Sequence, residues 1–124
     1  MGQKVELTKR VSFPMFTETA TARTATGNGT ALTLPDDVAE LFVGIDITAV
    51  SGTTPTLVVQ VQQQDANDVW QTLAATSSLN ATGQATLHLP AGSFVLLGGG
   101  QARIRWVIGG TTPSFTFRVG IHGR

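Results

Sequence analysis

The chain has 124 residues, of which 41% are hydrophobic and 13% are charged, with no cysteine and a formal net charge of +0. This length predicts one domain with a core of its own, and the missing cysteines exclude disulfides and thiolate metal sites. A balanced charge gives no general attraction for nucleic acid or an anionic membrane, and a surface with so few charges favours a protein that packs against others.

The first fifteen residues are predicted to form an extended N-terminal arm (1–15), followed by a β-sandwich domain (16–124). The arm begins with basic residues and continues into an apolar stretch broken by a proline. It has no apolar run typical of a secretory signal, so we expect the protein to be synthesised in the cytoplasm and used without crossing a membrane. Because apolar side chains are costly to leave in water, we expect the arm to dock, either onto the rest of this chain or onto a partner. Its candidate interface residues are Lys4, Lys9, Arg10, Phe13, Met15 and Phe16.

Alternating apolar and polar residues predict short strands along the rest of the chain. The best defined lie at 41–50, 57–62, 69–76, 85–90, 102–108 and 114–121. In each of them every second residue is expected to face the core, and both Trp70 and Trp106 fall at such inward positions. About eight short strands with no convincing helix predict an all-β fold, a single antiparallel β-sandwich that is jelly-roll-like or immunoglobulin-like.

One phrase occurs twice, as SGTTPTLVVQVQ at 51–62 and as GGTTPSFTFRVG at 109–120. Gly52 and Gly110 suit a sharp reversal, so each copy predicts a strand, a tight turn and a second strand. Aligning the copies on GTTP places inward isoleucines of the first upon arginines of the second. We expect a bulge in one copy to restore the phase; the alternative is that the apolar face of 104–108 points outward into a subunit interface.

Three arginines near the second copy are candidate interface residues. Keeping both apolar faces of that hairpin on one side places Trp106 opposite Phe117, and this register also places Arg105 opposite Arg118. Like charges across a ladder are unfavourable, so an acidic partner is expected nearby, in this chain or in another. All eight acidic residues lie at or before Asp68, and only arginines follow. Either strands of the two halves lie side by side and their charges mix, or the molecule has faces of opposite sign suited to head-to-tail packing. The candidates are Arg103, Arg105 and Arg118.

The sequence contains no motif for catalysis or cofactor binding. It lacks a nucleophile elbow, a P-loop and a dinucleotide fingerprint. His88 and His122 are expected at the surface. Asp65, Asn67 and Asp68 are expected to close a turn. The alternative is that their side-chain oxygens bind a calcium ion. We therefore expect no enzyme activity and no cofactor, and neither nucleic acid nor a membrane as partner.

Two stretches resemble small β-sandwich virion proteins of tailed bacteriophages, GIDITAVSGTTPTLVVQVQQQDANDVWQTL and RIRWVIGGTTPSFTFRVGI. The resemblance covers roughly residues 41–76 and 102–121. It implies a structural protein on the capsid surface of the virion, a head decoration or cement protein that binds the lattice of the major capsid protein. A neck or tail component is the alternative within this class. We expect a homotrimer or a cluster dictated by the lattice. The resemblance identifies no binding residues.

A carbohydrate-binding module is the alternative from a different class. Sugar-binding sandwiches present exposed aromatic platforms. This chain has no tyrosine and two tryptophans, and both tryptophans are expected in the core. The virion protein is therefore the preferred interpretation.

Overall fold

The computed structural model describes residues 13–35, 38–90 and 100–124, with the backbone alone for residues 13–18. Within these ranges every regular element is a strand, which confirms the all-β prediction. The described residues include no helix that could span a membrane. The strands are β1 (Phe13–Arg23), β2 (Gly27–Asn28), β3 (Leu32–Thr33), β4 (Leu41–Gln64), β5 (Trp70–Ala75), β6 (Gly83–Leu89) and β7 (Gln101–Gly123).

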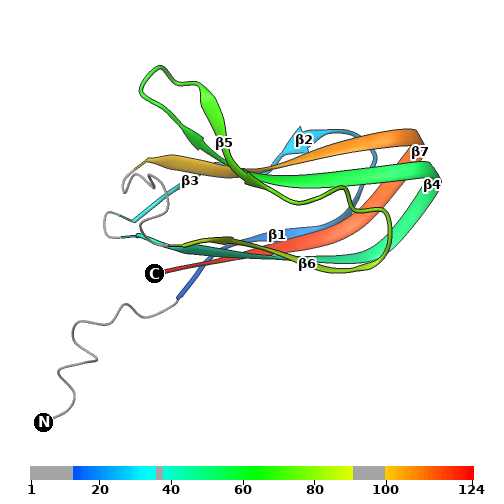
Figure 1. Cartoon of the computed structure of the whole chain (residues 1–124), viewed down its shortest axis with the longest axis horizontal. Helices are drawn as coiled ribbons and strands as arrows, with labels where there is room; N and C mark the ends of the chain where they lie inside the picture. The colour runs from blue at the N-terminus through cyan, green and yellow to red at the C-terminus, as the bar shows by residue number, and fades with distance from the viewer. Residues whose placement is uncertain (1–12, 36–37, 91–99) are drawn as a thin grey trace, which may run out of the picture.

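Two long strands, β4 and β7, form the centre of the molecule. They pair antiparallel over most of their length, from Leu41 opposite Gly123 to Gln63 opposite Ala102. Both bend at the repeated phrase, so each strand contributes one half to each of two layers (Figure 1). The prediction of two hairpins is therefore wrong. Each copy of the phrase lies inside one continuous strand, and the GTTP residues of each copy face those of the other.

The bend explains why the same residues occur twice. Gly52 and Gly110 have φ angles of 111° and 114°, in the left-handed region that favours glycine. A Cβ on Gly52 would lie 2.7 Å from the carbonyl oxygen of Thr112, and a Cβ on Gly110 would lie 2.8 Å from that of Thr54. Each copy thus packs its glycine against the Thr-Pro of the other, and the two bends require one another.

The two layers have the strand order of a jelly roll. In the first layer the order is β1, the second half of β7 (115–123), the first half of β4 (41–50) and β6. In the second layer it is β2 with β3, the first half of β7 (101–108), the second half of β4 (57–64) and β5. With each half counted as a strand, the orders are 1-8-3-6 and 2-7-4-5, the jelly-roll arrangement of the two predicted topologies.

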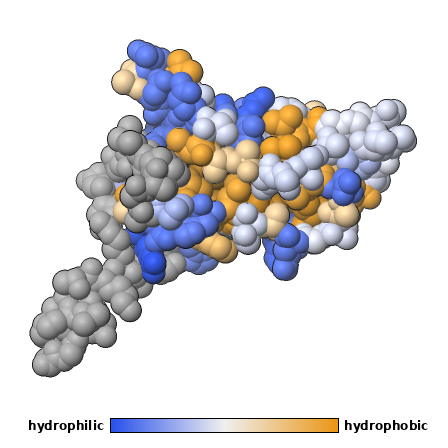
Figure 2. Space-filling model, viewed as in Figure 1, coloured by the Kyte–Doolittle hydropathy of each residue, from blue (hydrophilic) through white to orange (hydrophobic). Residues whose placement is uncertain are grey.

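The core lies between the layers and is built from the predicted alternate residues. Trp106 is buried and its ring meets that of Phe117 edge-on, with centroids 5.8 Å apart. The apolar face of 104–108 therefore points inward. The expected bulge lies in the strand half that leads into the first copy, where Thr48 is the extra residue between the pairs that Ile47 and Ala49 make with β7. Figure 2 shows apolar residues along the seam between the layers.

A second bulge corrects the prediction for Trp70. The β4–β5 pairing shifts between Val61 and Gln62, which leaves Leu73 as the extra residue in β5. Because of this shift, Trp70 lies on the outer face of the second layer instead of in the core. The guanidinium of Arg103 lies there, 4.2 Å from the centroid of the Trp70 ring.

Candidate functional site

The outer face of the first layer carries a shallow trough. It follows the outward residues of β4, which are Phe42, Gly44 and Asp46, together with their neighbours in register on β6 and β7. Surface hollows line this face from one end to the other. We define the trough by Glu40, Phe42, Gly44, Asp46, Thr86, His88, Arg118, Gly120, His122 and Arg124.

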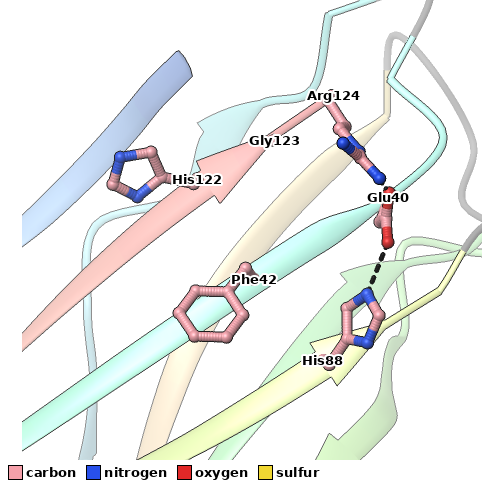
Figure 3. Close-up of a pocket in the computed structure, with 6 residues that line it drawn as sticks. All are labelled: Glu40, Phe42, His88, His122, Gly123 and Arg124. Atoms are coloured by element: carbon pink, nitrogen blue, oxygen red, sulfur yellow. Dashed lines mark hydrogen bonds and ion pairs between the residues drawn. The ribbon is translucent and has the colours of Figure 1, made fainter. Parts of the chain in front are cut away.

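Glu40 closes one end of the trough (Figure 3). Arg124 donates from Nε to Oε1 at 2.6 Å, and Nε2 of His88 lies 2.5 Å from Oε2. The backbone N–H groups of Glu40 and Arg124 also donate to each other's carbonyl oxygens. The hydrogen bond from Arg124, and then that from His88, hold the pKa of Glu40 below its ordinary value against the opposing effect of burial. An ionised carboxylate with both oxygens engaged is suited to holding this end of the trough in place, and poorly suited to taking up protons at neutral pH.

Phe42 is the largest apolar side chain of the trough. It lies between His88 of β6 and His122 of β7 in the same row, and 47% of its surface is exposed. In Figure 3 its ring stands on the open face of β4, away from the ion pairs of Glu40. A half-exposed aromatic ring in the middle of a sheet offers apolar contact area to another molecule.

The next row of the trough has a bare floor. Gly44 and Gly120 lie opposite each other across the β4–β7 ladder. Neither has a positive φ, and a Cβ on either would meet nothing within 4 Å. The fold therefore does not require glycine at these two positions, and glycine inside a strand weakens it. Their effect is to expose backbone at a place that another molecule can approach closely.

An ion pair closes the other end of the trough. The Nη2 and Nε atoms of Arg118 each lie 3.1 Å from Oδ2 of Asp46, which is its neighbour across the ladder. The predicted hairpin register with Arg105 opposite Arg118 is thus wrong, and the acidic partner of Arg118 lies in this chain. Since Arg124 also pairs with a carboxylate, charges from the two halves of the sequence mix on this face.

The other candidate residues do not join this trough. Arg103 and Arg105 lie on the outer face of the second layer, on the opposite side of the sandwich. Phe13, Met15 and Phe16 fall within β1, so the strand begins inside the segment expected to be an arm. The basic residues Lys4, Lys9 and Arg10 lie outside the described residues.

The residues with metal-binding potential form a turn. Oδ1 of Asp65 accepts from the backbone N–H groups of Asn67 and Val69 at 2.8 and 3.0 Å, and Oδ2 accepts from Nε2 of Gln71 at 2.9 Å. The hydrogen bond from Gln71, followed by the backbone ones, lowers the pKa of Asp65. N–H donors thus occupy both oxygens. Across residues 13–35, 38–90 and 100–124 no group of three or more His, Cys, Asp or Glu residues is placed to hold a metal.

Sequence patterns had placed His88 correctly at the surface, but they missed its contact with Glu40. These two residues are 48 positions apart, and Glu40 and Arg124 are 84 apart. Only the register of β4 with β6 and β7 brings them together. The exposed Phe42 and the unexplained glycine at 44 were the available signals, because both interrupt the polar outer face of a strand.

Comparisons with known proteins give one distant likeness. No protein-family model matches the chain, and no curated protein matches it. A solved structure described as the crystal structure of PirA has 15% sequence identity and a TM-score of 0.45, over 94% of this chain and 95% of that one. A likeness this distant has no bearing on function.

Proposed function

We propose that this chain is a structural protein of a tailed-phage particle, a decoration or cement protein that binds the lattice of the major capsid protein and stabilises the head. The sequence resemblance supports the phage particle. The observation that carries the binding role is the bare floor of Gly44 and Gly120 beside the half-exposed Phe42. Glycine at these positions weakens the sheet, but it lets a partner approach the backbone closely.

The trough also supports adhesion over catalysis. Both of its carboxylates are paired with basic groups, Glu40 with Arg124 and His88, and Asp46 with Arg118. A catalytic base requires a free acceptor within reach of a substrate. Pairs that neutralise each other leave a surface of low net charge, in which Phe42 supplies apolar contact area.

A single trough of this size gives modest affinity, and repetition on a lattice raises it. Many weak contacts, multiplied over a shell or within a trimer, bind far more tightly than one contact. We therefore propose that the chain works as a homotrimer or as a cluster dictated by the capsid lattice. Residues 1–12, the part of the predicted arm that precedes β1, add a second attachment through Lys4, Lys9 and Arg10.

The test begins with purified particles. A decoration protein is expected at on the order of hundreds of copies per particle, whereas a neck or tail component occurs at about six or twelve. Complete absence of the chain from the particle would refute the proposal. A count of about six or twelve would move it to the neck or tail.

The site is tested with added side-chain bulk. Gly44→Val fills the floor of the trough, and we expect its binding to undecorated capsids to fall by about tenfold or more, because the approach to the backbone is blocked. Ala49→Val is the matched control, since it adds bulk to an exposed position of the same strand outside the trough. Equal binding by both variants would show that the trough is not the contact.

The arm is tested by deletion. Because β1 begins at Phe13, the deletion of residues 2–12 spares every described strand. We expect a folded protein that decorates capsids with at least about tenfold weaker affinity. Unchanged affinity would remove the docking role from the arm and leave that of the trough untouched.

The carbohydrate-binding alternative has weaker support. Trp106 is buried, and Arg103 covers one face of the Trp70 ring. Neither tryptophan presents the open platform that stacks on a sugar. Glycan binding that is lost on mutation of Phe42 would revive this alternative.

A further inference from the structure

Arg103 and Arg105 differ from the arginines of the trough in what they contact. They are neighbours on the outer face of the second layer, where Arg103 donates from Nε to Oε1 of Gln62 at 2.8 Å and Arg105 donates from Nη1 to Oδ1 of Asn28 at 3.0 Å. Among the residues that the structure describes, neither has a carboxylate partner. Two full charges are thus met only by neutral groups, the two amides and the Trp70 ring.

Arg103 is held rigidly by its surroundings. Its guanidinium lies over the Trp70 ring, and the Gln62 that accepts from Nε is buried, with its own Nε2 donating to Thr72 Oγ1 at 3.1 Å. These contacts use Nε and one face of the group, so the terminal nitrogens are left for an acceptor from outside. Burial, and then the charge of Arg105, lower the pKa of Arg103. A nearby anion would offset both effects by favouring the charged form of Arg103.

We propose that this face binds carboxylate groups of a partner protein, with the terminal nitrogens of Arg103 and Arg105 as donors. The proposal rests on the proposed function, because it gives the chemistry by which a capsid lattice would contact the second layer. An acidic partner is expected wherever like charges lie side by side. Arg118 finds its acid within the chain, and the Arg103–Arg105 pair finds it in another.

Carboxylates fit this face better than the phosphates of a nucleic acid do. The planar fork of a guanidinium matches carboxylates and phosphates alike, so the rest of the face decides between them. Binding to nucleic acid draws on many phosphate contacts and on aromatic rings that are free to stack on bases. The described part of this face offers two cations, and the Trp70 ring already lies against Arg103. Beside Arg105, Val58 and Val107 face each other across the ladder and add an apolar patch suited to a protein surface.

The test uses a labelled decaglutamate peptide and the isolated full chain, at low salt. We expect the wild type to bind the peptide, and the double variant Arg103→Gln, Arg105→Gln to bind it about tenfold more weakly. Arg103→Lys, Arg105→Lys keeps the charge and loses the fork, and its affinity is expected to lie between the two. Unfolding midpoints of all three proteins confirm that each is folded.

Three outcomes decide the proposal. Equal binding of the peptide by the wild type and the glutamine variant would overturn it. The proposal would also be overturned if the wild type binds a ten-residue oligothymidylate more tightly than the peptide and the glutamine variant loses that binding. The face would then be a nucleic-acid site. The proposal would be supported if the glutamine variant binds both the peptide and the capsids more weakly than the wild type does.

The same experiment separates this proposal from the proposed function. Peptide binding is measured without any particle. A wild type that binds decaglutamate but no capsid would refute the capsid role and leave the carboxylate face standing. A wild type that binds capsids but not decaglutamate would refute the carboxylate proposal and leave the proposed function intact.

Discussion

Two pairs of glycines lie along the β4–β7 ladder, and they are there for different reasons. Gly52 and Gly110 lie at the bend with left-handed φ angles, and an added Cβ would meet backbone atoms at 2.7 to 2.8 Å. Gly44 and Gly120 lie in the trough with ordinary φ angles and open space around them. The first pair is required by the fold. The second pair is not required by the fold, and the proposed contact with a partner would explain it.

The comparison is tested most strongly at the bend. Gly52→Ala or Gly110→Ala is expected to lower the free energy of unfolding by about 2–4 kcal/mol, because alanine is strained at this φ and its Cβ collides with the opposite strand. Urea unfolding of each variant measures the change. Gly44→Ala is the matched control. A bend variant as stable as that control would erase the distinction between the two pairs.

The trough pair is expected to respond in the opposite direction. Gly44→Val combined with Gly120→Val should raise the free energy of unfolding by about 1–2 kcal/mol, since a β-branched residue favours a strand and meets no neighbour. The same urea titration applies. A clear loss of stability would mean that the fold does need glycine there, and would remove the main support for the binding role.

The strain at the bend is tested by replacing the two threonines that have positive φ angles. Thr54 and Thr112 have φ angles of 46° and 44°, where a β-branched residue is strained. Thr54→Asn or Thr112→Asn should add about 1 kcal/mol to the free energy of unfolding, because asparagine tolerates this conformation. Thermal unfolding measures the gain. Thr48→Asn, in the same strand but without a positive φ, controls for the change of side chain.

Acid is expected to loosen the end of the trough. The pKa of Glu40 is lowered in the folded protein, so its contribution to stability is complete above the ordinary pKa of a glutamate and is lost as the pH falls through the lowered value. Glu40→Gln should therefore flatten the fall of the melting temperature between roughly pH 5 and pH 3. Asp68→Asn is the charge-matched control, and an identical acid profile for both variants would contradict the role of Glu40.

Local alternation was enough to find the core but not the path of the chain. The predicted inward residues, from Val43 to Phe117, are buried because the pleat fixes them once the strand exists. The GTTP phrase was mistaken for a hairpin turn because its glycine and proline fit one equally well. What makes it a bend is the opposite copy, almost sixty positions away, and no local pattern contains that neighbour.

The candidate site was predictable only in parts. Arg118, Arg103 and Arg105 were identified by charge, but their partners follow from register, which places Asp46 beside the first and amides beside the others. Trp70 was misplaced because the bulge at Leu73 reverses the alternation within β5. The trough could not be predicted because it is formed by three strands, β4, β6 and β7. Its clearest signal in the sequence was Gly44, a glycine within a strand and away from any turn.

The continuous run of β7 through both layers has a consequence for how the molecule is made. This strand is an inner neighbour in each sheet, so neither sheet can close while the ribosome still holds residues 101–123. Until β7 emerges, the apolar faces of the strands that pair with it stay exposed to solvent. The two layers are therefore expected to be completed together once β7 has emerged, rather than one strand at a time from β1.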